Sequence, residues 1–158
     1  MTPEMLQSLL HLPTFPATAA ELVRVAGIDA AASLISAWPG QRFPVPVRVG
    51  GANPEGQINW ERLVEIVGGA AATAIVRHWG GGDLYVPSCA DSRRTLDHDG
   101  IRREYDELTR GGNYSGRGAV FEIALRHGLT SRAIEKILKL PDSPPPPGAG
   151  KQLGLFSA

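Results

Sequence analysis

The chain has 158 residues, of which 42% are hydrophobic and 20% are charged, with one cysteine and a formal net charge of zero. This length suits one compact domain and a smaller second one, and a single cysteine excludes a disulfide within the chain. It has no run of eighteen apolar residues and no secretory signal pattern. We therefore expect a cytoplasmic protein without membrane contact.

The zero net charge hides an uneven distribution. Residues 1–92 hold five arginines against eight acidic side chains, whereas residues 93–140 hold ten basic side chains against seven acidic ones. The two parts therefore carry net charges of opposite sign. If the protein binds a polyanion such as DNA, the contact is expected in the C-terminal part.

Three helix starts are predicted near the N-terminus. Thr2 can cap a helix that has Pro3 at its first position. The spacing of Thr18 and Glu21 is that of a capping box for a second helix. Asp29 can cap a third helix, through residues 30–37.

A segment of the chain repeats after 79 − 38 = 41 residues, the shift that places Trp38 on Trp79. The same shift superposes Leu22 on Leu63 and several further pairs, namely Gly27 on Gly68, Gly40 on Gly81, Val45 on Val86 and Pro46 on Pro87. Each copy is expected to contain two helices separated by a glycine, followed by a tryptophan, a glycine turn, a short extended segment and a proline. Such a period indicates duplicated supersecondary units, here forming one helical domain with a pseudo-symmetric core.

The extended segments of the two copies differ. The first contains Pro44 and Pro46, which cannot donate to a sheet ladder, so it is not expected to pair as a regular strand. The second, residues 83–86, follows three glycines and has the composition of an edge strand. Its simplest partner is the same strand of a second chain, which would give a ribbon across a dimer axis. The alternative is an unpaired glycine-rich linker.

Residues 88–98 are expected to form a linker. Asp99 can cap a helix through about residue 109, with Ile101, Tyr105 and Leu108 on its apolar side. Residues 116–140 then predict two helices joined at Gly128, a position that favours a positive φ. Thr130 or Ser131 is expected to cap the second of them.

The spacing of the joint is typical of a DNA-binding helix-turn-helix, with Ala124 four positions before Gly128 and Ile134 six positions after it. A purely structural helical hairpin is the alternative. Side chains able to reach bases or phosphates lie on the outer face of the second helix. The expected DNA-binding residues, which include one arginine of the preceding helix and one tyrosine of the strand, are Tyr85, Arg117, Thr130, Ser131, Arg132, Glu135, Lys136 and Lys139.

Two stretches together resemble the Mor family of phage Mu-like transcription activators, which includes the related C proteins. They are residues 80–87, Gly-Gly-Gly-Asp-Leu-Tyr-Val-Pro, and residues 124–132, Ala-Leu-Arg-His-Gly-Leu-Thr-Ser-Arg. The resemblance covers about residues 60–140. It implies a homodimer on double-stranded DNA, in which short strands pair across the axis near the minor groove and two helix-turn-helix units enter major grooves.

The resemblance also implies contact with host RNA polymerase in the bacterial cytoplasm, in association with the nucleoid. On this interpretation Tyr85 and Asp83 lie near the DNA backbone, and Gly80, Gly81 and Gly82 form a hinge. An acidic Asp83 departs from what a DNA-contacting ribbon needs, since phosphate repels it.

The C-terminal segment changes character. Residues 141–150 form a proline- and glycine-rich spacer, and the apolar tip that follows resembles the Gln-Leu-x-Leu-Phe peptide that docks on the bacterial sliding clamp. Its expected partner-binding residues are Gln152, Leu153, Leu155 and Phe156. An adaptor or inhibitor of the clamp is therefore the alternative function.

No catalytic constellation is recognised. The four histidines lack metal-ligand spacing, no nucleophile has a neighbouring base, and residues 80–83 lack the lysine of a phosphate loop. We therefore expect no enzyme activity, cofactor or metal. The predicted fold is mainly α: residues 1–87 form a helical dimerisation region with a short strand, and residues 99–140 form a three-helix DNA-binding domain.

Overall fold

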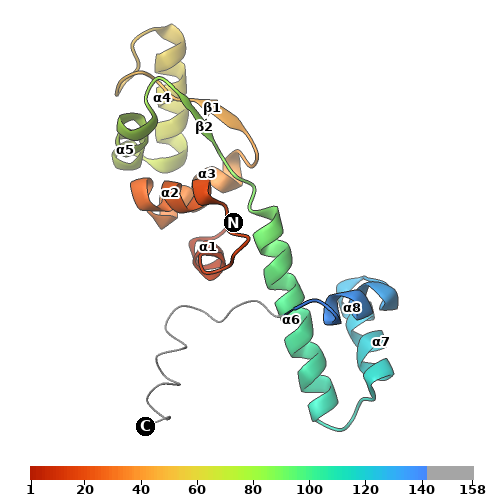
Figure 1. Cartoon of the computed structure of the whole chain (residues 1–158). Coiled ribbons are helices and arrows are strands. Elements are labelled where there is room, and N and C mark those ends of the chain that lie inside the picture. Colours follow the sequence, from red (N-terminus) through yellow and green to blue (C-terminus); the bar gives the residue numbers. More distant parts are fainter. Residues whose placement is uncertain (142–158) are drawn as a thin grey trace, which may run out of the picture. The chain divides into compact units, whose positions relative to one another are not determined.

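The computed structural model describes residues 1–141, which divide into two compact units (Figure 1). Unit 1 comprises Met1–Ala90, and unit 2 begins at Asp91. The mainly helical class is confirmed, with one two-stranded antiparallel sheet among the described residues. None of the described helices is long and apolar enough to span a membrane.

Unit 1 contains five helices and both strands. In chain order they are α1 (Pro3–Leu9), α2 (Ala17–Ala26), α3 (Ile28–Ala37), β1 (Arg42–Pro44), α4 (Pro54–Val67), α5 (Gly69–Trp79) and β2 (Asp83–Tyr85). Its core is made of side chains from all of these elements, including fully buried Leu6, Leu22, Leu34, Leu63 and Ile75.

The predicted helix starts of unit 1 are only partly correct. Thr2 caps α1, since its Oγ1 accepts a hydrogen bond from the Met5 backbone N–H at 3.1 Å. The capping box at Thr18 is wrong, because α2 already begins at Ala17, directly after the extended backbone of Pro16. Asp29 is not a cap either. It lies in the first turn of α3, which follows Gly27 at φ 91° and ψ 161°.

The expected lack of an in-chain partner for residues 83–86 is also wrong. β2 pairs with β1 of the same chain, in the register Arg42–Tyr85, Phe43–Leu84 and Pro44–Asp83. The prolines do not prevent this pairing. Val45 N–H donates to the Gly82 carbonyl at 2.9 Å, so by strand alternation the missing N–H of Pro44 falls on the side facing away from β2.

Unit 2 is built from three helices, α6 (Ala90–Arg110), α7 (Gly116–His127) and α8 (Ser131–Leu138). Helix α6 begins about ten residues earlier than expected, so residues 90–98 are helical and not a linker, and Asp99 lies within the helix. Asp99 instead forms an ion pair with Arg102 at 2.6 Å, one turn further along. A carboxylate three positions before an arginine suits a helix interior as well as a cap.

Candidate nucleic-acid interface

The core of unit 2 holds α7 and α8 against α6. Ile101 of α6 meets Val120, Ile123 and Ala124 of α7 and Ile134 and Ile137 of α8, and all six side chains are at most 8% exposed. Tyr105, Leu108 and Leu138 pack at the edge of this cluster. The small Ala124 side chain is 5% exposed, as expected where two helices approach closely.

The turn between α7 and α8 is fixed by local hydrogen bonds. Gly128 adopts φ 64° and ψ 30°, the left-handed conformation that glycine tolerates best, which confirms the predicted joint. The N–H groups of Gly128 and Leu129 both donate to the Ala124 carbonyl. The bond from Leu129 spans five residues and is the 6→1 hydrogen bond of a Schellman motif. Thr130 caps α8 by accepting from the Ala133 N–H at 3.1 Å, so the direction in which α8 leaves the turn is set by the backbone.

An ionic cluster joins the end of α7 to the middle of α6. Glu104 Oε2 lies 2.8 Å from His127 Nε2, and Glu104 Oε1 accepts from Arg126 Nη1 at 2.7 Å. Arg126 also donates to Glu122 through Nε at 3.2 Å. The hydrogen bonds from His127 and then Arg126 lower the pKa of Glu104 below its ordinary value. Because the cluster engages the last two residues of α7, it holds the helix end immediately before the turn.

Helix α8 exposes a face of polar and basic side chains. Every residue predicted to contact DNA on this helix is exposed, namely Thr130, Ser131, Arg132, Glu135, Lys136 and Lys139. Within residues 1–141, the side chains of Arg132, Lys136 and Lys139 form no ion pair or hydrogen bond. Cations that are not neutralised by their own protein can replace counterions on a phosphate backbone.

Arg117 lies near the start of this face. With Ser115 and Phe121 of the α7 region and Ser131 and Glu135 of α8, it lines an open groove of about 610 Å³. Ser115 caps α7 by accepting from the Gly118 N–H at 3.1 Å. The structure thus brings together three of the predicted residues, Arg117, Ser131 and Glu135.

Tyr85 belongs to unit 1 and lies on the outer face of the small sheet. The strands have alternating burial, so Phe43 and Leu84 face the core while Arg42 and Tyr85 face outward. Arg42 lies directly opposite Tyr85, and its guanidinium is 3.9 Å from the Asp83 carboxylate. Sequence reasoning missed Arg42, because residues 42–44 were not expected to be a strand.

The glycines of the expected hinge have roles inside unit 1. A Cβ on Gly80 would lie 2.4 Å from the Val76 carbonyl oxygen and 3.0 Å from that of Val47. Gly81 adopts φ 82°, where other residues are strained. These two positions therefore require glycine for the turn from α5 into β2, independently of any approach to DNA.

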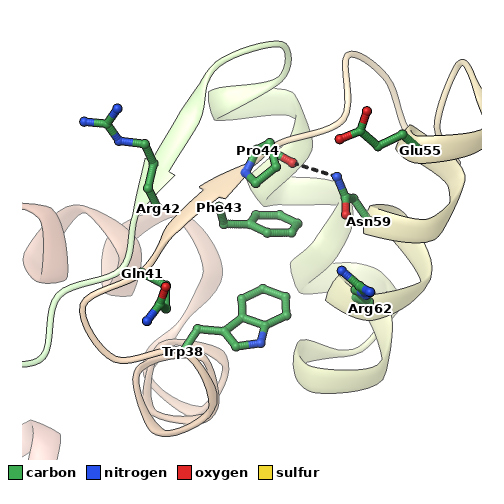
Figure 2. A pocket seen from close by; sticks show the side chains of 8 residues that line it. All are labelled: Trp38, Gln41, Arg42, Phe43, Pro44, Glu55, Asn59 and Arg62. Carbon is green, nitrogen blue, oxygen red and sulfur yellow. Dashed lines mark hydrogen bonds between the residues drawn. The ribbon is translucent and has the colours of Figure 1, made fainter.

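A second pocket lies in unit 1, between the aromatic pair Trp38 and Phe43 on one side and Asn59 and Arg62 of α4 on the other (Figure 2). Its volume is about 410 Å³. The two aromatic rings stack with centroids 4.8 Å apart, and Asn59 Nδ2 donates to the Pro44 carbonyl at 3.5 Å. Glu55 also lines the pocket and would repel a phosphate, so we do not assign this pocket to DNA contact.

Helical units that present free cations on an exposed helix after a tight turn are typical of regulators that act on DNA. The comparison with protein families agrees with this class. The model of the Mor transcription activator family matches residues 52–143, more than half of the chain, and the chain belongs to that family. Comparison with curated proteins gave no match, and neither did comparison with solved structures.

Membership of a family of transcription regulators agrees with the absence of catalytic patterns in the sequence. The clamp-like peptide, with Gln152, Leu153, Leu155 and Phe156, lies outside the described residues.

Proposed function

We propose that the protein is a phage or prophage transcription activator that binds double-stranded DNA through α8. The observation that carries the proposal is the exposed face of α8, with three cations that have no ion-pair or hydrogen-bond partner within residues 1–141, on a helix whose direction is fixed by a capped turn. The family match supports the regulatory role. Host RNA polymerase is the proposed protein partner, as the resemblance to phage Mu-like activators implies.

The chemistry of the α8 face suits a major groove. Arg132 near the start of the helix can donate two hydrogen bonds to a guanine edge, while Lys136 and Lys139 can pair with phosphates. Arg117 can contribute a further phosphate contact, because it shares the groove at the start of α8. Glu135 can accept from a cytosine amino group, which would give the acidic residue of the face a role in selectivity.

The test is DNA binding by fluorescence anisotropy, on promoter DNA and on scrambled DNA, across a salt series. Arg132→Ala should weaken binding to promoter DNA by about five- to 150-fold, since a bidentate base contact contributes about 1–3 kcal/mol. Lys136→Ala should weaken binding to both DNAs and reduce the salt slope by about one.

Arg77→Ala is the matched control, since Arg77 is an exposed arginine of unit 1 without a partner among the described residues. It should bind DNA as the parent does. If Arg132→Ala and Lys136→Ala also bind as tightly as the parent, α8 is not the DNA-reading helix and the hairpin is only structural.

A further inference from the structure

Unit 1 contains, after α1, two copies of one substructure. β1 and β2 begin 83 − 42 = 41 residues apart, and the same shift relates the glycines that join the helices of each copy. Gly27 between α2 and α3 has φ 91° and ψ 161°, and Gly68 between α4 and α5 has φ 84° and ψ 165°. The first copy is therefore α2, α3 and β1, and the second is α4, α5 and β2. The backbone at these two glycines is nearly the same, in agreement with the 41-residue repeat expected from the sequence.

The two copies pair as the two chains of a symmetric dimer would. At the centre of the sheet Phe43 faces Leu84, which is its own equivalent in the other copy. The flanking hydrogen bonds also come in equivalent pairs. They are Gly40 N to Val86 O (2.8 Å) with Gly81 N to Val45 O (3.2 Å), and Val86 N to Gln41 O (2.8 Å) with Val45 N to Gly82 O (2.9 Å).

The helices obey the same symmetry. α2 packs against α5, and the equivalent contact, α4 against α3, is also present. Equivalent core positions have equal burial: Leu22 and Leu63 are both fully buried, and so are Ala31 and Ala72. Reciprocal contact of this kind, in which i meets j and j meets i, defines a twofold interface between identical subunits. Here both sides of the interface belong to one chain.

The charges at the sheet favour pairing within the chain. Arg42 is the equivalent of Asp83, and the two side chains lie 3.9 Å apart. In a twofold ribbon made from β2 of two chains, with the same register, this place would be occupied by Asp83 from both chains. Two carboxylates on the same face of such a ribbon repel each other, whereas Arg42 and Asp83 attract each other. The first copy therefore complements β2 better than a second β2 would.

Only one copy is connected to a DNA-binding unit. After the second copy, Pro87 leads into α6 and unit 2. After the first copy, the equivalent Pro46 leads into the segment that enters α4. The family match begins at residue 52 and thus contains the second copy without the first.

We infer that unit 1 is a dimerisation interface closed within a single chain, so that the protein is a monomer in solution and brings one unit 2 to each DNA site. The expected homodimer rested on the family resemblance and on a strand without a partner in the chain, and β1 supplies that partner. The part of this inference that concerns DNA rests on the proposed function. The part that concerns the oligomeric state does not.

The first test is the mass of the full chain by light scattering coupled to size exclusion, over a hundredfold range of concentration. The inference requires 16.8 kDa throughout. A mass of twice that value overturns it, whichever surface forms the dimer. Because the measurement uses no DNA, its outcome is independent of whether α8 binds DNA.

The second test asks whether the β1–β2 pair forms within one chain or by exchange between two chains. Residues 42 and 85 are directly opposite each other, at a separation that accommodates a disulfide. Arg42→Cys with Tyr85→Cys, on a Cys89→Ser background, should oxidise to a monomer without free thiols on a non-reducing gel. A covalent dimer as the main product would show exchanged chains and overturn the inference. Arg42→Cys alone on that background is the control, because it can form disulfides only between chains.

The third test is stoichiometry on DNA. Titration of the promoter fragment well above the dissociation constant should saturate at one protein per site. If the free protein is a monomer but two molecules bind each site at saturation, DNA assembles a dimer. This result would overturn the inference that each DNA site receives one unit 2. Failure to bind any DNA would overturn the proposed function and leave the light-scattering result standing.

Discussion

Both units join consecutive helices at a glycine with positive φ, but they start the helix after that glycine by different means. In unit 1, α2, α3 and α5 begin without a side-chain cap, and the positive φ of Gly27 and Gly68 sets the angle between consecutive helices. In unit 2, Ser115 and Thr130 cap α7 and α8 through their side chains. In unit 1, where Thr2 and Asn53 cap only α1 and α4, the helix after each of these glycines therefore depends on packing between the two halves, whereas in unit 2 the helix after Gly128 is started locally by Thr130.

Core truncation should give the largest effects and tests the equivalence of the two halves. Leu22→Ala and Leu63→Ala remove side chains that are both fully buried at equivalent positions. Each should cost about 2–5 kcal/mol of unfolding free energy in urea denaturation, and the two costs should be similar. A small cost for one and a large cost for the other would show that the halves do not contribute equally to the core.

Loss of a helix cap should have a smaller effect, confined to unit 2. Thr130→Ala removes the acceptor for the Ala133 N–H and should cost about 1 kcal/mol. Thr130→Ser keeps the hydroxyl and is the matched control. DNA affinity should fall in the alanine variant, since the first turn of α8 would fray. If the serine variant lost as much stability as the alanine variant, the threonine methyl group and not the cap hydrogen bond would account for the loss.

Acid should weaken the link between α6 and α7 by a still smaller amount. The pKa of Glu104 is lowered in the folded protein, mainly by the hydrogen bond from His127 and then by that from Arg126. A carboxyl with a lowered pKa stabilises the fold above its unfolded pKa, and this contribution is lost as the pH falls through the folded pKa.

Glu104→Gln should therefore lower stability at pH 7 by no more than about 1 kcal/mol. The difference from the parent should disappear in strong acid. Melting temperatures measured between pH 7 and pH 2 provide the check. A difference that stays constant over this range would show that the charge of Glu104 is not involved.

Local patterns in unit 2 were sufficient to predict α7, the turn and α8, because Gly128 and Thr130 act on their own neighbours. The extent of α6 was not predicted, since Asp99 has the same local chemistry in a cap as in an ion pair with Arg102. The 41-residue repeat in unit 1 was visible in the sequence, but the partner of β2 was not. Strand pairing depends on which N–H groups face the neighbour, and prolines alone do not show this.

The outer face of the α8 hairpin was also predictable, because exposure follows from helical spacing once the apolar stripe is known. The position of Arg42 opposite Tyr85 was not predictable. It arises from the register between two strands that are far apart in the sequence, and no local signal encodes that register.

The duplication also changes how unit 1 responds to mutation. In a dimer of identical chains, every substitution at the interface occurs twice, and a residue on the twofold axis must tolerate its own copy. Here Phe43 and Leu84 occupy equivalent positions but are encoded by separate codons, and the same is true of Arg42 and Asp83. Each side can vary alone, so one half can acquire a charge or a larger ring while the other keeps the complementary partner. Selection can therefore act on the two faces of this interface as if they were two different proteins.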